Sequence, residues 1–573
     1  MDKKSLIGFL LIMLILIIWP MWNKLFNPGQ PPSTTPTEQT SPESTTTSQA
    51  PPETTTQAPA QVTATAPQQI MPSPAPGETL ALVPGKLVTV QTDNIIAVLS
   101  SQGGVLKSLK LKHYHLENGE SDSLVEMLAG SRQNPWPVNG ALTLGDETKL
   151  LPLNNMPFTA SSESFTLKKG DEPRVLTFTY ADSSGAVIRK DFTFNPRTYQ
   201  IKFRLTIDNP KALGLDEKLT VGWLVPELPT DKNLKEDLSK FAGFYSMGGE
   251  VVENKSLKEG KLELIASGKS DWVANRSKYF TNAMITEKEP GSEVMILGTQ
   301  TSLVDHEGKS QEWKKFGMGL TFDLKGDKFT NDFLIYSGPL DYFRLEKIGY
   351  NLGQLVDMGW KVFRPFAIGI LWIFIQMHKV LFNYGVVIII FSVVMKLVFW
   401  PLTRKSSTSM MKMKEMQPKL QEIKEKFGKD PKRLNEETMK MYKEYGVNPF
   451  GSCLPILVQL PIFWALFSVL RNSIELRAAD FVFWITDLSQ KDPTWVLPIL
   501  MGLAMFFQQK MTITDPKQKM MAYIMPVVFV FIFGSMPSGL VLYWTIFSVI
   551  GIFEQLIIKR RLDEEKRLAA ASQ

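Results

Sequence analysis

Five apolar segments in the last third of the chain constrain its fold more than any other feature. Each meets or approaches the roughly 20 residues that a helix needs to cross the hydrocarbon core of a bilayer. We expect membrane-spanning helices at Asn383–Leu402, Phe450–Leu470, Thr494–Met511, Met520–Met536 and Gly539–Ile558. A shorter apolar run at residues 365–377 is flanked by basic residues, which favours an amphipathic helix lying in the membrane interface.

The N-terminus carries one more apolar run, from Leu6 to Trp19, which follows Lys3 and Lys4. A cleavable signal peptide is the alternative, but no small-residue cleavage site comes after the run. We therefore expect an uncleaved transmembrane anchor at residues 1–24 with its basic end in the cytoplasm.

A segment of low complexity follows the anchor. Residues 28–77 are almost entirely Pro, Thr, Ser, Gln and Ala, without Lys or Arg. Such a composition cannot bury enough apolar surface to fold. It predicts a disordered tether over residues 25–77, with a mucin-like recognition segment as the alternative.

The middle of the chain has the alternation of half-buried strands. Apolar and polar residues alternate from Tyr199 to Ile207 and again from Leu176 to Tyr180. Turn-forming pairs such as Gly103-Gly104 and Gly248-Gly249 separate such segments. We expect a large, mostly β domain at residues 78–345, with a sandwich architecture.

Charge sets the expected topology. The loop from Thr403 to Asn448 holds 12 Lys and Arg against 7 Asp and Glu, a net charge of +5. The positive-inside rule places this loop in the cytoplasm. With a cytoplasmic N-terminus, this requires six spans and an extracytoplasmic β domain. The chain's net charge of +6 therefore reports topology rather than nucleic-acid binding.

These expectations divide the chain into consecutive parts. After the β domain we expect a linker with the interfacial helix at 346–382, then a five-span core at 383–558. A cytoplasmic helical hairpin at 403–448 lies within that core, and a cytoplasmic tail occupies 559–573. The fold class is thus multi-domain: a polytopic α-helical membrane domain joined to a mostly β extracytoplasmic domain.

Composition and motifs argue against most soluble enzymes. The one cysteine, Cys453, excludes a disulfide framework and a multi-cysteine zinc site. Ser/His/Asp, paired-carboxylate and nucleotide-loop arrangements have no recognisable local motif. The pair His113 and His115 leaves a metal-binding or acid–base role open. We expect no catalytic residue, no metal and no cofactor.

Lys396 is the one charged residue well inside an expected span, where an ammonium costs about 2.5–3.5 kcal/mol. Two interpretations stay open: the side chain snorkels to the cytoplasmic interface, or it lies in a water-filled cavity. Glu554 lies close to a span end, so we expect it at the interface. Without a carboxylate at mid-membrane depth, a proton-coupled transporter is disfavoured.

Other polar residues fall in the same spans. Their usual role is hydrogen bonding between helices, and the alternative is that they line one polar groove with Lys396. They are Ser392, Gln459, Gln508, Gln509, Thr545 and Ser548.

The basic loop has a heptad-like pattern that predicts a helical hairpin coiled coil. Apolar residues run from Met413 to Phe427 at spacings of 3 and 4, and resume from Leu434 after a Gly428–Pro431 break. Pro418 either kinks the first helix or marks its start. The loop is rich in methionine, which suits contact with varied apolar segments; packing between the two helices is the alternative.

Several short motifs occur through the apolar C-terminal part of the chain. They are Asn448-Pro449-Phe450-Gly451-Ser452-Cys453-Leu454-Pro455, Gln459-Leu460-Pro461-Ile462-Phe463, Trp484-Ile485-Thr486-Asp487-Leu488, Leu497-Pro498-Ile499-Leu500-Met501-Gly502, Phe506-Phe507 and Pro537-Ser538-Gly539-Leu540-Val541-Leu542-Tyr543. In these segments the chain resembles the YidC family of membrane protein insertases, in its Gram-negative six-span form. The resemblance covers about 200 C-terminal residues and is weaker over the β domain.

The resemblance implies an insertase or chaperone that moves nascent transmembrane segments from the cytoplasm into the bilayer through a hydrophilic groove. The groove's basic residue is usually Arg in bacterial members, and Lys396 stands at that position. The expected groove is Lys396, Gln459, Gln508 and Thr545, with Tyr543 and Trp544 as an aromatic surface for the apolar part of the substrate. Met413, Met416, Met439 and Met441 are the expected hairpin contacts.

The resemblance also implies a bacterial inner-membrane location, with both termini cytoplasmic, and a β domain like a sugar-mutarotase supersandwich in the periplasm. Implied partners are nascent membrane proteins and lipid, with the ribosome, the signal recognition pathway and the Sec translocon as further candidates. Two alternatives remain: a small-molecule transporter or channel, and a membrane-anchored periplasmic carbohydrate-binding protein.

Overall fold

The structure is a computed structural model that describes residues 85–116, 123–130, 133–146, 149–305, 307–446, 454–512 and 516–571. The expected anchor at 1–24 and tether at 25–77 lie outside these residues, as does Cys453. The described residues form two compact units that divide between Asp357 and Met358. Each unit is described by itself.

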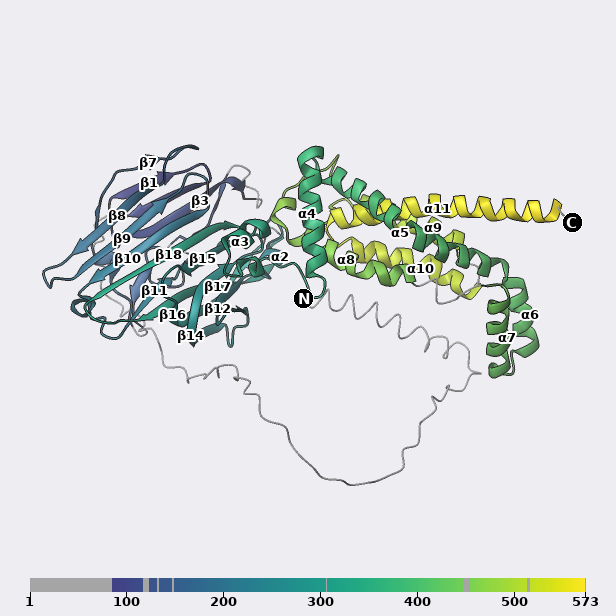
Figure 1. The fold of residues 1–573 in the computed structure, drawn as a ribbon, viewed down its shortest axis with the longest axis horizontal. Coiled ribbons are helices and arrows are strands. Elements are labelled where there is room, and N and C mark those ends of the chain that lie inside the picture. Colours follow the sequence, from purple (N-terminus) through teal and green to yellow (C-terminus); the bar gives the residue numbers. More distant parts are fainter. Residues whose placement is uncertain are drawn as a thin grey trace, which may run out of the picture. The chain divides into compact units, whose positions relative to one another are not determined.

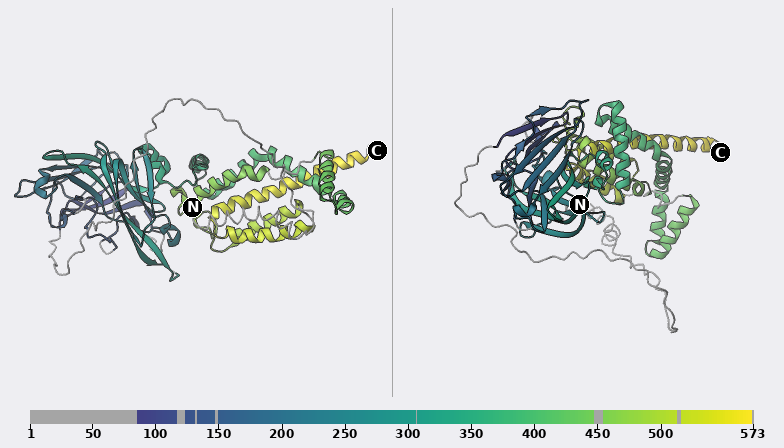
Figure 2. Two further views of the ribbon diagram at one scale, coloured as in Figure 1. Left: turned by 90° about the horizontal axis from the view of Figure 1, so that it is seen from below. Right: turned by 60° about the vertical axis from the view of Figure 1, so that its left-hand side comes forward.

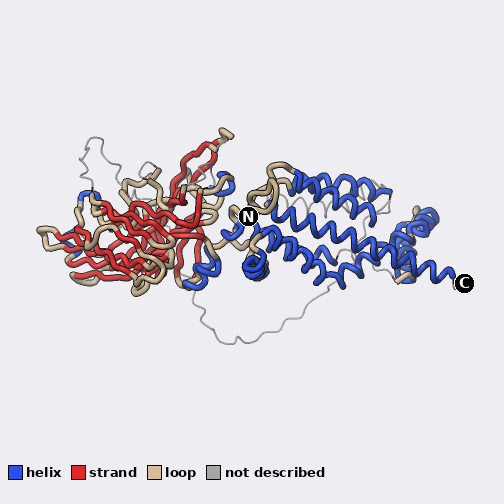
Figure 3. The backbone as a smooth tube through the Cα atoms, turned by 90° about the horizontal axis from the view of Figure 1, so that it is seen from above, coloured by secondary structure: helices blue, strands red, loops and turns tan. Residues whose placement is uncertain are grey.

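The first unit is built almost entirely of strands (Figures 1 and 3). Its strands are β1 Leu87–Gln91, β2 Ile95–Ser100, β3 Val105–His115, β4 Leu124–Glu126, β5 Thr143–Gly145, β6 Thr159–Ala160, β7 Phe165–Thr166, β8 Arg174–Ala181, β9 Val187–Phe194, β10 Gln200–Asp208, β11 Lys218–Trp223, β12 Ala242–Met247, β13 Glu250–Asn254, β14 Lys261–Arg276, β15 Phe280–Thr286, β16 Gly291–Val304, β17 Ser310–Asp323 and β18 Lys328–Pro339. Two short α-helices accompany them, α2 Leu234–Leu238 and α3 Tyr342–Ile348.

The strands form two sheets. A five-stranded sheet has the order β4-β3-β2-β1-β7, and a 13-stranded sheet has the order β5-β11-β17-β16-β14-β15-β18-β10-β9-β8-β6, with β12 and β13 joined to it through β14. Almost every pairing is antiparallel; the β1–β7 pair is parallel. The expectation of a large, mostly β domain is confirmed.

The core of this unit follows the alternation seen in the sequence. In β10, Ile201, Phe203 and Leu205 are buried while the intervening residues face outward. Phe203 lies opposite Phe192 of β9 in the sheet register, and the two rings stack with centroids 5.0 Å apart. Period-two side chains on paired strands thus make one continuous apolar face.

A buried lysine links the two sheets. Lys190 of β9 donates its Nζ hydrogen bonds to the carbonyl oxygens of Gly103, at 2.9 Å, and Leu142, at 3.1 Å. Gly103 and Gly104 both have positive φ, and a Cβ on Gly104 would lie 3.3 Å from the Lys190 side chain. The Gly-Gly turn therefore lets the backbone come close enough to accept this bond.

The second unit is helical. Its α-helices are α4 Arg364–Leu381, α5 Tyr384–Glu415, α6 Gln417–Phe427, α7 Pro431–Glu444, α8 Leu454–Asn472, α9 Val496–Thr512, α10 Pro516–Phe533 and α11 Ser538–Ala571. In Figures 1 and 2, α5, α8, α9, α10 and α11 run alongside one another, and α4 crosses them at a steep angle.

The helices coincide with the expected spans but differ at their ends. The stretches Tyr384–Met413 and Ser538–Glu565 are long and apolar enough to cross a membrane, and Val496–Met511 and Tyr523–Phe533 are shorter apolar stretches. Helix α5 continues through Pro401 and past Leu402, where we expected the span to end, and α11 continues well past Ile558. Helix α4 has 18 residues, longer than the apolar run that predicted it.

The outer surface of this unit is more apolar than that of a water-soluble fold. Val394, Leu397 and Val398 of α5 are exposed, whereas Ser392 and Lys396 of the same helix are buried. Large apolar side chains of α9, α10 and α11 are also exposed, including Leu503, Val527 and Phe553. An apolar outer surface, with a few polar groups buried among apolar side chains, is what a lipid environment stabilises.

The basic loop contains the helices α6 and α7, which pack on each other, and the coiled coil stays a prediction. The first helix is interrupted at Met416, and α6 begins there with Pro418 in its first turn. Proline has no N–H to donate, so it is tolerated at a helix start, and this fixes the break. Asp430 caps α7 by accepting backbone N–H bonds from Lys432 and Arg433.

Candidate functional site

An ion pair lies in the interior of the helical unit. Lys396 of α5 places its Nζ 2.9 Å from Oε2 of Glu554 on α11, and the two side chains are 5% and 3% exposed. The snorkelling interpretation of Lys396 is therefore wrong, because the ammonium turns inward to a carboxylate. Glu554, which we expected at the membrane interface, is buried within the helical unit and supplies a carboxylate beside the buried cation.

Each member of the pair has a second, uncharged partner. Thr403, seven residues beyond Lys396 on α5, donates its hydroxyl to Oε1 of Glu554 at 2.9 Å. The ammonium of Lys396 lies 4.5 Å from the centre of the Phe547 ring, within cation–π range. Buried charges need partners of this kind, since burying an unpaired charge costs several kcal/mol.

Gln508 of α9 approaches the same point across a glycine. A Cβ on Gly551 of α11 would collide with the Gln508 amide and lie 3.6 Å from Nζ of Lys396. The missing side chain at Gly551 therefore leaves the space in which the amide approaches the ammonium. Two expected groove residues, Lys396 and Gln508, are thus brought together.

Three other expected site residues lie on α8 and α11. Gln459 of α8 donates to the Tyr543 hydroxyl at 3.4 Å, and Tyr543 is buried between Phe391 and Phe547. Thr545 bonds to a carbonyl of its own helix, that of Val541.

Trp544 belongs to an aromatic cluster on the other side of α11. It packs edge-on against Phe463 of α8, with centroids 5.6 Å apart, and against Phe533 of α10 at 5.4 Å. Trp544 is partly exposed, unlike Tyr543. The two neighbouring aromatic residues therefore have different environments.

We group buried polar side chains of α5 and α11 with Gln508 of α9 and call them the polar seam. Helices α5 and α11 pack on each other, and α9 packs on α11. Its members are the buried residues Ser392, Lys396, Thr403, Ser407, Thr545, Ser548 and Glu554, and the partly buried Gln508. It offers a cation, an anion, hydroxyls and an amide in an interior surrounded by apolar surface.

Sequence reasoning did not assign four residues to this site: Thr403, Phe547 and Gly551, which it did not single out, and Glu554, which it placed at the interface. One signal could have found them. Lys396 and Thr403 are seven residues apart, two helical turns, and therefore lie on one face of α5. Ser548, Gly551 and Glu554 recur every three residues and share one side of α11.

The expected hairpin contacts divide into two groups. Met416 and Met441 are buried against each other, and Met413 packs on them together with Leu420. Met439 is 43% exposed. The packing alternative accounts for the first group, and Met439 remains the one of the four with a large accessible surface.

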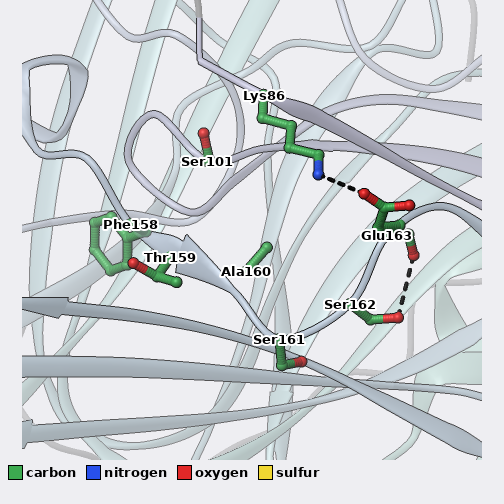
Figure 4. A pocket seen from close by; sticks show the side chains of 8 residues that line it. All are labelled: Lys86, Ser101, Phe158, Thr159, Ala160, Ser161, Ser162 and Glu163. Atoms are coloured by element: carbon green, nitrogen blue, oxygen red, sulfur yellow. Dashed lines mark hydrogen bonds and ion pairs between the residues drawn. The ribbon is translucent and has the colours of Figure 1, made fainter.

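The β unit has a shallow, open pocket, which Figure 4 shows. It is lined by Lys86, Phe158 and Glu163 and by small polar side chains, and Lys86 pairs with Glu163 at 2.9 Å. Both charged side chains are largely exposed. This arrangement contains no buried reactive group and gives no catalytic geometry.

A buried ionic cluster lies elsewhere in the β unit. Lys278 pairs with Asp231 at 2.9 Å and with Glu236 at 3.2 Å, and Lys278 and Asp231 are fully buried. Asp237 accepts backbone N–H bonds from Thr230 and Asp231. Burial, and then the neighbouring Asp231 carboxylate, raises the pKa of Asp237 to about 6. These bonds fix a loop and α2, a structural role.

No described group of three or more His, Cys, Asp or Glu residues could hold a metal ion. His113 and His115 lie at the end of β3, two residues apart.

Comparisons with known proteins cover both units. Residues 376–566 match the family described as 60Kd inner membrane protein, and residues 87–373 match the family described as YidC periplasmic domain. The chain is similar to the membrane protein insertase YidC of Chlorobaculum parvum, with 32% identity over 100% of this chain and 97% of that protein. The corresponding protein of Geobacter sp. strain M21 is 35% identical over 83% of this chain and 86% of its own length.

One solved structure is described as an active YidC insertase with the first transmembrane domain resolved. Its match with this chain has 20% sequence identity and a TM-score of 0.35, and it covers 82% of this chain and 94% of the solved one.

Proposed function

The chain belongs to the YidC family of membrane protein insertases, and from that premise we propose how its own residues carry out insertion. It is an inner-membrane insertase with a periplasmic β domain; its substrates are nascent membrane proteins, and it acts at the lipid bilayer. It is not an enzyme. This identity sets aside the transporter and carbohydrate-binding alternatives.

The proposed path for the substrate is the polar seam. The polar flank of a nascent segment passes beside Lys396, Gln508 and Thr545, with Gln459 next to them, while its apolar part moves past Tyr543 and Trp544 into lipid. The observation that carries this proposal is the polar seam itself, enclosed by helices whose outer surface is apolar. Polar groups beside the hydrocarbon lower the cost of bringing a hydrophilic flank through it.

Hydrophobic transfer supplies the driving force in this proposal. A segment of about 20 apolar residues gains free energy when its surface leaves water for lipid. The protein then only has to lower the barrier for the flank, so the mechanism requires no nucleotide.

Site-specific crosslinking to stalled nascent chains tests this path. A photoreactive residue at Gln508 or Thr545 should crosslink to the polar flank of a single-span substrate. The matched control is Leu500, which is on the same helix as Gln508 but exposed on its apolar face. Equal crosslinking of the flank from Leu500 and Gln508 would contradict the path.

We propose six spans with both termini in the cytoplasm, and α4 at the periplasmic interface. The +5 charge of the 403–448 loop supports this topology, and so does the steep angle between α4 and the other helices of its unit (Figure 1). The single cysteine allows a clean test. With Cys453 replaced by Ser, a new cysteine at Lys429 or Gln573 should resist impermeant reagents in intact cells. Labelling of either would refute the topology.

We also propose that the hairpin and the tail meet the delivery machinery. Exposed Met439 suits contact with an arriving apolar segment, and the tail opens with Lys559, Arg560 and Arg561, which suit a ribosome surface. The signal recognition pathway and the Sec translocon are further proposed partners. Cosedimentation with ribosomes should fall when residues 559–573 are removed. Unchanged cosedimentation would remove the tail from the proposal.

A further inference from the structure

The buried pair of Lys396 and Glu554 makes the polar seam electrically neutral. A lone ammonium at this depth would attract acidic substrate flanks and repel basic ones. Here the cation has a carboxylate 2.9 Å away, and both are almost fully buried. A substrate charge of either sign therefore meets a site that is already compensated.

We propose that Lys396 and Glu554 form a charge-exchange site for substrate side chains of either sign. A substrate carboxylate takes the place of Glu554 at the Lys396 ammonium, and a substrate ammonium or guanidinium takes the place of Lys396 at the Glu554 carboxylate. This inference rests on the proposed path along the polar seam, and it adds Glu554 as a residue that determines specificity.

The geometry lets the pair open without stranding either charge. In the closed pair, the Glu554 carboxylate also accepts a hydrogen bond from the Thr403 hydroxyl at 2.9 Å, a partner that does not depend on Lys396. The Lys396 ammonium also lies 4.5 Å from the Phe547 ring, a partner that does not depend on Glu554. Each charge thus retains one uncharged partner, which lowers the cost of separating them.

The remaining group at the site has no sign preference. Gln508 reaches the pair from α9 through the gap at Gly551. An amide carries both a donor and an acceptor, so it can bond to a carboxylate or to an ammonium. Exchange conserves the number of ion pairs, so the free energy changes less than it would at a lone charge.

The test uses the full-length protein in liposomes without a membrane potential, and one single-span substrate with three translocated tails. The tails carry two Gln, two Asp or two Lys at the same positions. The readout is the protease-protected tail, expressed for each charged tail as a ratio to the Gln tail in the same variant. This ratio cancels any loss of folded insertase.

Wild type should insert the three tails within about twofold of one another. Glu554→Gln leaves the cation alone, so the Lys-tail ratio should fall about tenfold and the Asp-tail ratio should hold or rise. Lys396→Gln should do the reverse. The swapped variant Lys396→Glu with Glu554→Lys restores a pair and should bring both ratios back toward wild type.

Two failures can be told apart. If wild type does not insert even the Gln tail, the proposed function fails. If the Gln tail inserts but both single variants keep wild-type ratios, or both lower the Asp ratio only, charge exchange is overturned and insertion stands.

Discussion

The two units of this protein expose different kinds of side chain at their surfaces. In the β unit, β10 buries Phe203 and exposes Arg204, which pairs at the surface with Asp332. In the helical unit, α5 buries Lys396 and exposes Leu397. The same kinds of residue are thus sorted by two solvents, water around one unit and lipid around the other.

Both units also contain a buried lysine, and its surroundings differ. Lys278 of the β unit has two carboxylates, and the nearby Asp237 is fixed by backbone N–H groups. Lys396 of the helical unit has one carboxylate, one ring and an approaching amide. The partners of Lys278 hold a loop in place. Around Lys396, each charge of the ion pair has a second, uncharged partner that it can keep when the pair opens.

The largest effect should come from breaking the ion pairs that Lys278 makes in the β unit. Lys278→Met leaves Asp231 and Glu236 without their cation in a closed interior, which should cost about 3–5 kcal/mol of unfolding free energy. The matched control is Lys288→Met, because Lys288 pairs with Asp332 at the surface and should cost less than about 1 kcal/mol. Urea unfolding of the full-length protein in detergent measures both. Equal costs would mean that the cluster has no structural role.

The apolar outer surface of the helical unit predicts the second largest effect. Leu397→Asp puts a carboxylate on the lipid-facing side of α5, which should cost about 2.5–3.5 kcal/mol of insertion free energy and lower the amount found in membranes. Val304→Asp is its counterpart in the β unit, equally exposed but facing water, and should change stability by less than about 0.5 kcal/mol. Membrane fractionation measures the first change, and thermal unfolding the second. If Leu397→Asp is harmless, lipid does not cover this face.

The comparison also explains what the sequence could predict. Strand β10 was predictable because its burial follows an alternation within nine residues. The Lys396–Glu554 pair was not, because it joins two helices far apart in sequence. The expected helix end at Ile558 also differs from the structure, in which α11 continues to Ala571. Local patterns report a helix face, but they do not report which other helix will cover it.

The hairpin offers a comparison within one helix. Met441→Ala removes a side chain that is buried against Met416, and should destabilise the hairpin by about 2 kcal/mol. Met439→Ala, two residues away on the exposed side, should change stability by less than about 0.5 kcal/mol and instead weaken substrate contact. Hydrogen exchange of residues 417–444 reports the first effect, and crosslinking to nascent chains the second. Faster exchange in both variants would refute this division.

The smallest effect concerns Lys190, whose partners are carbonyl oxygens rather than carboxylates. Burial lowers its pKa from 10.5 to about 7 in the folded protein. Between these values the unfolded chain binds more protons than the folded one, so unfolding free energy rises with pH. From pH 7 to 8 the gain should be about 1 kcal/mol. Urea unfolding at the two pH values measures this gain in unfolding free energy.

Lys190→Met should lose the gain, while Lys202→Met, at an exposed position of β10, should keep it. A wild-type slope in Lys190→Met would show that Lys190 is not the source of this pH dependence.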